Sequence, residues 1–252
     1  MGSTLKHESL PETIGVNPAC KISTVSIGQE GNTIILVDDF LSTPERLINL
    51  AKNAGKFIDE GDNYYPGQRV DVPQVYSQLL ENYFSGNIAA LLNAPHEASP
   101  KVVESKFCIA TKTPAELVPI QSIPHFDTSD VNQIAAVHYL CDSPFQGTSF
   151  YQHRTSGFES ISPERSKAYF KWLSREAITT GLPKSGYIMG DTELFKRVKK
   201  VDCKFNRIIF YKSNMLHAGD IDAETDLSED PLSGRLTANS FIRLSPDTAQ
   251  TN

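Results

Sequence analysis

Apolar residues recur along the chain with two different spacings, and the change from one to the other divides it near Pro100. In the first part they follow the spacing of amphipathic helices. One helix is predicted to begin at Pro44, with an apolar face that includes Leu47, and a second is predicted over about residues 75–92. We therefore expect residues 21–100 to supply a helical support.

Strand patterns dominate after this point. Short runs that are continuously apolar, or that alternate with a period of two, predict strands. The predicted strands are residues 102–113, 131–140, 148–151, 207–211 and 236–244, with an earlier one at 34–37 and a helix from Ser162 to about Leu173 among them. Helices followed by a series of short strands predict an α+β chain with a β-sandwich or jelly-roll core.

The domain organisation predicted from these patterns is simple. A length of 252 residues fits a single domain of this class. We expect a flexible N-terminus at 1–20, because its first residues are polar, then the helical support, and the jelly-roll core over 101–244.

Composition excludes several partners. The formal net charge is −6 and no basic run is present, so nucleic acid is not an expected partner. No apolar run reaches the length of a membrane span, and the N-terminus lacks the apolar segment of a secretory signal. None of the four cysteines forms a C-x-x-C pair, which favours reduced thiols and a cytoplasmic protein.

The candidate chemistry lies in His125-Phe126-Asp127 and in His217, about ninety residues further on. Side chains two apart in a strand point to the same side, so His125 and Asp127 can face one point. Two imidazoles and one carboxylate are the facial triad of non-haem iron(II) oxygenases, which leaves coordination positions open. The sequence therefore predicts a mononuclear metal site. His138 is the rival for a ligand position, but a buried, hydrogen-bonded core histidine is the expected role of that residue.

The order of these residues resembles the iron(II)/2-oxoglutarate-dependent dioxygenases, particularly their prolyl-4-hydroxylase-like branch. That family has His-x-Asp, a long gap, a second His and then a basic residue, here Arg235 in Gly234-Arg235-Leu236-Thr237. Tyr139-Leu140 and the glycine-led segment 147–151 resemble the strands that follow His-x-Asp in the family. The resemblance covers about residues 100–244 and implies a double-stranded β-helix, a cupin-like jelly roll with supporting N-terminal helices.

The resemblance also implies roles. His125, Asp127 and His217 would bind Fe(II), and 2-oxoglutarate and O2 would take the open positions. Arg235 would bind the distal carboxylate of 2-oxoglutarate through its two-pronged guanidinium, with help from the Tyr139 hydroxyl.

The gap between His217 and Arg235 is eighteen residues, longer than the family usually has. An acidic insertion at 220–230 accounts for it, since long surface insertions cost little. Lys212 and Arg243 are the competing cations, and Arg243 lies near the far end of its strand.

The implied reaction is hydroxylation of an unactivated C–H bond, with release of succinate and CO2. Halogenases of the superfamily carry Gly or Ala in place of the metal carboxylate, and Asp127 therefore favours hydroxylation. An amino acid, a peptide or protein side chain and a small natural product all stay open as substrates. Candidates for the substrate pocket are Tyr64, Arg69, His153 and Arg154.

Two other functions fit part of the pattern. One is a non-catalytic jelly-roll module that binds a metal or ligand. The other is a zinc hydrolase on the same two histidines and carboxylate, which would not need Arg235 or Tyr139.

Overall fold

A computed structural model describes residues 14–61, 64–94, 98–142, 144–181, 186–222, 224–225 and 227–246. Most of the segment expected to be flexible, residues 1–13, lies outside the described residues. Among the residues described, no helix has both the length and the apolar character needed to cross a membrane.

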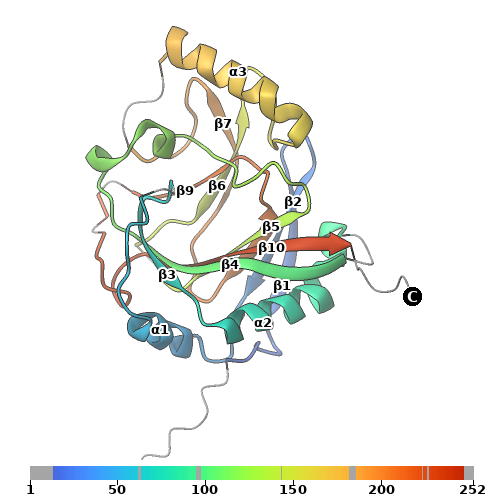
Figure 1. Cartoon of the computed structure of the whole chain (residues 1–252), viewed down its shortest axis with the longest axis vertical. Helices are drawn as coiled ribbons and strands as arrows, with labels where there is room; N and C mark the ends of the chain where they lie inside the picture. The colour runs from blue at the N-terminus through green and yellow to red at the C-terminus, as the bar shows by residue number, and fades with distance from the viewer. Residues whose placement is uncertain are drawn as a thin grey trace, which may run out of the picture.

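Two antiparallel sheets form the body of the protein (Figure 1). The larger has seven strands, in spatial order β1 (Lys21–Ile27), β2 (Asn32–Asp38), β8 (Ile208–Lys212), β5 (Gln133–Tyr139), β10 (Leu236–Pro246), β4 (Ala98–Ala110) and β3 (Gly67–Asp71). The smaller has three, in the order β7 (Phe195–Val201), β6 (Thr148–His153) and β9 (His217–Gly219).

The connections between the sheets define a double-stranded β-helix. The chain passes from β4 in the large sheet to the segment around His125, which pairs with His217 at the edge of the small sheet. It returns to the large sheet at β5 and continues through β6 and β7, then β8, then β9, and ends in β10. This repeated crossing confirms the predicted jelly-roll core.

Alternation along the strands separates two hydrophobic cores. On β5, Ile134 and Ala136 pack with the helices on one face, whereas Ala135 and Tyr139 pack between the sheets on the other. Phe150 of β6 and Tyr211 of β8 meet in this inner core, with ring centroids 4.9 Å apart. Burial on both faces explains why β5 is almost continuously apolar.

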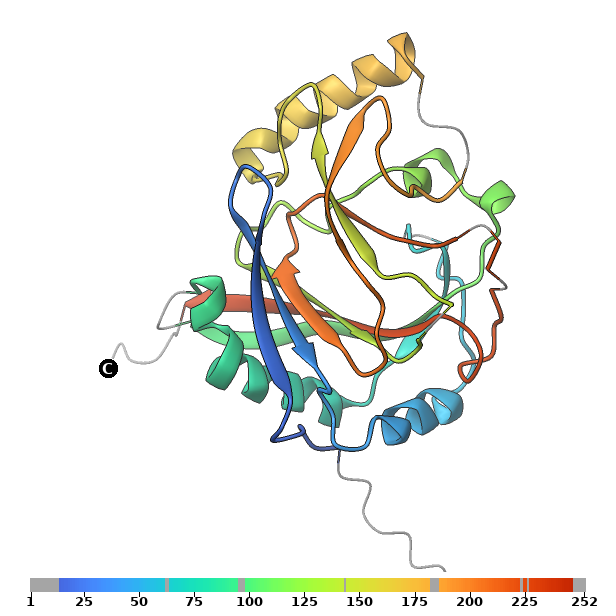
Figure 2. The ribbon, with the colours of Figure 1, turned by 180° about the vertical axis from the view of Figure 1, so that it is seen from behind.

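Helices α1 (Pro44–Asn53) and α2 (Gln74–Tyr83) cover the outer face of the large sheet (Figures 1 and 2). The second predicted helix stops being α-helical at Tyr83 and continues as a π-helical turn, η1 (Phe84–Ile88), and a 3-10 turn, η2 (Ala90–Leu92). Residues 21–100 are more than a helical support, because β1, β2 and β3 come from them as well.

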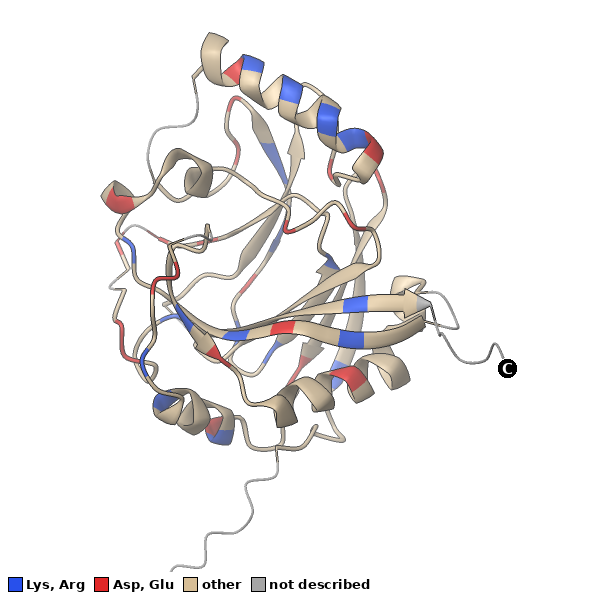
Figure 3. Cartoon of the chain, viewed as in Figure 1, with Lys and Arg blue, Asp and Glu red and all other residues tan. Residues whose placement is uncertain are grey.

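Helix α3 (Pro163–Thr179) lies on the opposite side of the molecule and covers the small sheet (Figure 1). Its Tyr169 and Leu173 pack with Tyr151 and Phe195 of that sheet. It runs six residues beyond the predicted end. Two further 3-10 turns, η3 (Pro114–Glu116) and η4 (Pro119–Ser122), lead into the His125 segment. Charged residues of both signs are spread over these elements (Figure 3).

Candidate metal centre

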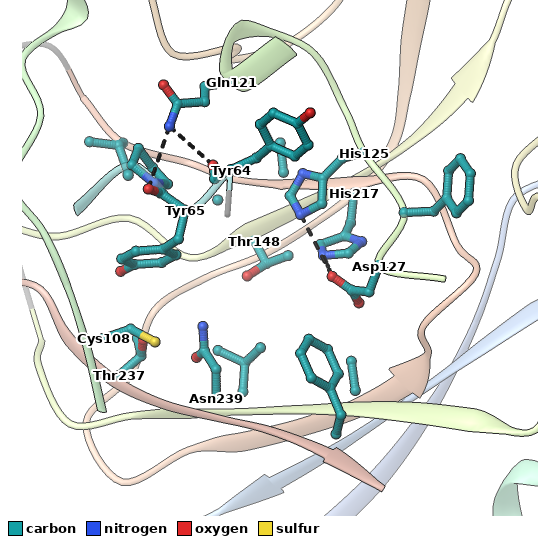
Figure 4. A pocket seen from close by; sticks show the side chains of 18 of the residues that line it. Tyr64, Tyr65, Cys108, Gln121, His125, Asp127, Thr148, His217, Thr237 and Asn239 are labelled. Carbon is teal, nitrogen blue, oxygen red and sulfur yellow. Dashed lines mark hydrogen bonds and ion pairs between the residues drawn. The ribbon is translucent and has the colours of Figure 1, made fainter. Parts of the chain in front are cut away.

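His125, Asp127 and His217 meet at the edge of the small sheet. One ligand atom from each lies within 4.8 Å of the other two. Nε2 of His125 and Nε2 of His217 are each 3.8 Å from Oδ1 of Asp127. The three side chains point toward one another (Figure 4). This is the convergence that the two-residue spacing of His125 and Asp127 predicts.

Backbone pairing sets this geometry. The Asp127 amide donates to the Ser213 carbonyl at 2.9 Å, so the segment that carries the first two ligands lies along the loop before the third. The Nδ1–H of His217 donates to the Met215 carbonyl at 2.9 Å, since a carbonyl can only accept. That bond leaves the lone pair on Nε2 directed at the site.

Burial shapes the protonation of the three groups. It lowers the pKa of His217 to about 4, and that of His125 to about 4 with a further contribution from the neighbouring His217. Burial also raises the pKa of Asp127 to about 6. His125 still has 49% of its side chain accessible, because solvent reaches it through the cavity while protein surrounds the rest. At neutral pH the imidazoles are neutral, which is the form that binds a metal.

The centre opens into a cavity of about 420 Å³ that runs along one face of β10. Arg235 and then every second residue, Thr237, Asn239 and Phe241, line it. Side chains two apart share one face of a strand, and the six positions from Arg235 to Phe241 span roughly 20 Å. Thr237 and Asn239 lie below His125, Asp127 and His217 in Figure 4. The cavity therefore has a guanidinium at one end and the His125, Asp127 and His217 side chains along its wall.

Arg235 is held firmly at its end of the cavity. Its side chain is buried; Nε donates to the Gln146 carbonyl at 3.2 Å and Nη2 to the Gly147 carbonyl at 2.9 Å. Beside it, Oγ1 of Thr237 and Oδ1 of Asn239 are buried without a hydrogen-bond partner among the described residues. Unpaired buried polar atoms are costly, and these two face a cavity that a polar ligand can fill.

Tyr139 does not line the cavity, although its predicted contact with the 2-oxoglutarate carboxylate would require that. Its hydroxyl forms a hydrogen bond with Oγ1 of Thr148 at 2.7 Å, and Thr148, not Tyr139, lines the cavity. Tyr65 lines the cavity directly, and burial raises the pKa of its phenol while nearby Arg235 lowers it. The sequence predicts the adjacent Tyr64 as a residue of the substrate pocket, and nothing in the sequence distinguishes these two tyrosines.

The four residues predicted to form the substrate pocket divide into two pairs. Tyr64 and Arg69 line the cavity. His153 and Arg154 do not, and that prediction is wrong. Nε2 of His153 pairs with Glu176 at 2.7 Å in the core beneath α3, and Arg154 reaches Asp191 at 2.9 Å on the surface.

The register of β6 explains the error. Side chains alternate between the two faces along β6, and the register shift against β7 places its extra residue, Val198, on β7. Phe150 packs between the sheets, whereas Tyr151 belongs to the core beneath α3, and His153 faces the same way as Tyr151. The face of β6 that carries Tyr151 and His153 therefore packs beneath α3 and not against the cavity.

His138, the rival ligand, lies on the helix side of β5 as expected of a core histidine. Its Nδ1 accepts from the Tyr76 hydroxyl at 3.0 Å and its Nε2 donates to Oδ1 of Asn206 at 3.2 Å. Both ring nitrogens are therefore satisfied away from the cavity.

The sequence does not single out the residues at the other end of the cavity. Glu104, Gln133 and Phe241 line its other end, on β4, β5 and β10. Residues an even number of positions apart on a strand share one face. Gln133 is therefore on the same face of β5 as Tyr139, and Phe241 is on the same face of its strand as Arg235. The pairing of β4 with β10, which brings Glu104 opposite Phe241, has no local signal in the sequence.

A family model matches residues 18–242, most of the chain. The protein belongs to the family of unknown function DUF6445. No curated protein matches the sequence.

The DUF6445 chain is distantly similar to several solved structures. HygX from Streptomyces hygroscopicus, with nickel, 2-oxoglutarate and hygromycin B bound, is 12% identical, with 85% of this chain and 84% of that chain covered and a TM-score of 0.48. The non-heme alpha ketoglutarate dependent carbocyclase SnoK from nogalamycin biosynthesis is 14% identical over 86% of this chain and 84% of that chain, with a TM-score of 0.46. The corresponding epimerase SnoN is 12% identical over 86% and 82%, also with a TM-score of 0.46. Likeness at this level says nothing of the reaction.

Proposed function

We propose that this protein is an Fe(II)- and 2-oxoglutarate-dependent dioxygenase that hydroxylates its substrate. The observation that carries the proposal is that one cavity joins the His125, Asp127 and His217 cluster to the buried guanidinium of Arg235. A metal-binding module alone does not need a buried cation beside its metal, and neither does a zinc hydrolase.

The donor set fits iron(II). Two neutral imidazoles and one carboxylate on one side of a metal leave the other positions for ligands, which is the arrangement of non-haem iron oxygenases. With iron(II) bound there, O2 would be the oxidant, and 2-oxoglutarate would leave as succinate and CO2.

The protein's own residues would orient the co-substrate. The distal carboxylate of 2-oxoglutarate would lie against Arg235, whose Nε and Nη2 are already fixed by main-chain carbonyls and therefore cannot swing away. The unpaired oxygens of Thr237 and Asn239 line the path from Arg235 toward the metal ligands. A buried cation is the partner that a carboxylate needs when it leaves water.

Asp127 supports hydroxylation over halogenation. Its carboxylate faces both histidines at 3.8 Å, so it would occupy the coordination position that a halide requires. The substrate would then receive hydroxyl rather than halogen.

Formation of succinate from 2-oxoglutarate tests this function. With Fe(II) and O2 present, we expect the wild type to release succinate even without substrate, at a slow uncoupled rate. Asp127→Ala should reduce this rate at least about 100-fold, because it removes a metal ligand. Asp202→Asn is the matched control, since its side chain is 77% exposed and pairs with Lys200 away from the cavity. Equal rates in Asp127→Ala and the wild type would refute the proposal.

A further inference from the structure

A carboxylate stands at the end of the cavity away from Arg235. Glu104 of β4 pairs in register with Phe241 of β10, six residues along from Arg235, and both line the cavity. Its side chain is 40% exposed. The two ends of the cavity thus carry opposite charges.

The neighbours of Glu104 leave its negative charge incompletely neutralised. Nη1 of Arg69 donates to its Oε1 at 3.0 Å, but Arg69 also pairs with Glu60. Lys106 in turn pairs with Glu60 at 3.0 Å and with Asp71 at 2.9 Å. Arg69 is therefore shared between two carboxylates, Glu104 and Glu60. No described residue donates a hydrogen bond to the second oxygen of Glu104.

The other groups at this end suit a cation on an apolar stem. Phe241 offers an aromatic ring directly opposite Glu104, and rings of this kind attract ammonium groups. Gln133 is only 8% exposed and lines the cavity, and its side-chain amide has no hydrogen bond within the described part of the chain. Its carbonyl oxygen can accept from an ammonium group. Ala135 lines the wall on β5, in register with Phe241.

An anionic group fits this end poorly. Arg69 is the cation that lines it, but its two Nη atoms already pair with Glu104 and Glu60. A carboxylate placed here would meet Glu104 at close range, and like charges in a partly enclosed site repel strongly.

We propose that the substrate carries a protonated amine, and that Glu104, with Phe241 and Gln133, binds it and so decides which substrates are accepted. This rests on the proposed function, in which the Arg235 end holds the co-substrate. Glu104 would hold the cationic group of the substrate, and the carbon to be oxidised would lie between that group and the metal ligands.

The test compares three probes of one shape and different charge. Hexylammonium, 1-hexanol and hexanoate are titrated into the wild type by calorimetry at pH 7, with Mn(II) and 2-oxoglutarate present. We expect hexylammonium to bind about tenfold more tightly than 1-hexanol, as one charge-assisted hydrogen bond would give, and hexanoate to bind weakest. This comparison needs no variant, so it holds even if a variant fails to fold. Equal affinities, or tighter binding of hexanoate, would overturn the inference.

Two variants locate the preference. In Glu104→Gln, hexylammonium should bind no more tightly than 1-hexanol. Asp71→Asn is the control, because it removes one negative charge from the adjacent strand β3. The Asp71 side chain is 84% exposed and does not line the cavity, so this variant should still bind hexylammonium more tightly than 1-hexanol. Loss of the preference in Asp71→Asn alone would also overturn the assignment of Glu104.

Binding of 2-oxoglutarate to the wild type separates the two proposals. If 2-oxoglutarate binds and the amine is not preferred, the inference fails and the proposed function stands. If the amine is preferred through Glu104 but 2-oxoglutarate does not bind, the proposed function fails and the amine site stands.

Discussion

The main chains of His125 and His217 hold each other in place. The His125 amide donates to the His217 carbonyl at 2.9 Å, and the His217 amide donates to the His125 carbonyl at 2.8 Å. Their rings lie with centroids 4.4 Å apart. Two candidate ligands about ninety residues apart in sequence are thus positioned by one antiparallel bridge, which exists only in the folded protein.

Metal binding should therefore stabilise the fold. A ligand that binds only the folded state adds about 2.7 kcal/mol of stability at 100 times its Kd. We expect Mn(II) at that concentration to raise the melting temperature of the wild type by several degrees in a thermal unfolding experiment. Asp127→Ala should show no rise, and Asp202→Asn should show the full one. A rise of the same size in Asp127→Ala would place the metal elsewhere.

Arg235 should determine the affinity for 2-oxoglutarate. In Arg235→Lys a point charge replaces the fixed two-pronged group, and we expect the KM for 2-oxoglutarate to rise at least about tenfold with a smaller change in kcat. Arg243→Lys is the matched control, because Arg243 is 53% exposed and lies near Asp130 at 3.9 Å, outside the cavity. A larger effect from Arg243→Lys would move the anchor to that residue.

Gly147 should be needed to hold Arg235. A Cβ at this position would collide with the Val201 carbonyl oxygen, and the Gly147 carbonyl accepts from Nη2 of Arg235. We expect Gly147→Ala to lower both the stability in urea and the affinity for 2-oxoglutarate. Gly86→Ala, where a Cβ meets nothing within 4 Å, should leave both unchanged or slightly raise the stability. Wild-type affinity in Gly147→Ala would show that Arg235 does not depend on this contact.

The ligand positions could be predicted from the sequence because they depend on local spacing. His125 and Asp127 are two apart on an extended segment, and that alone makes them converge. The position of Arg235 at the cavity could be predicted despite the long gap after His217, since an insertion between two strands does not move the strand that follows. Strand parity then gives Thr237 and Asn239 on the same face.

The other parts of the site depend on pairings that have no local signal. The pairing of β4 with β10 brings Glu104 to the cavity, and the face of β6 that carries Tyr151 and His153 packs beneath α3. Which of two adjacent tyrosines, Tyr64 or Tyr65, approaches Arg235 depends on the path of a loop. The hydroxyl of Tyr139 stops short of the cavity because Thr148 lies in between.

His138 makes the stability depend on pH. Burial lowers its pKa to about 4, so the folded protein holds it neutral between Tyr76 and Asn206. The unfolded chain takes up a proton near the ordinary value of about 6.5, so this contribution is complete above pH 6.5 and is lost as the pH falls toward 4. At pH 5 the loss is about 2 kcal/mol.

Because the pKa values of His125 and His217 are also lowered, this loss is measured as a difference between two proteins. The stability in urea should fall by about 2 kcal/mol less in His138→Gln than in the wild type between pH 7 and pH 5. In NMR spectra, the His138 ring should keep the chemical shifts of a neutral imidazole down to pH 5. A titration of this ring near pH 6.5 would contradict the expectation.

Calorimetric titration of 2-oxoglutarate under anaerobic conditions, with and without Fe(II), tests the central claim most directly. If His125, Asp127, His217 and Arg235 form one site, 2-oxoglutarate should bind at one equivalent with the metal present and at least about 100-fold more weakly without it. Asp127→Ala should lose this dependence on the metal. Binding of 2-oxoglutarate that is equally tight with and without Fe(II), or no binding to the metal-loaded wild type, would contradict the account.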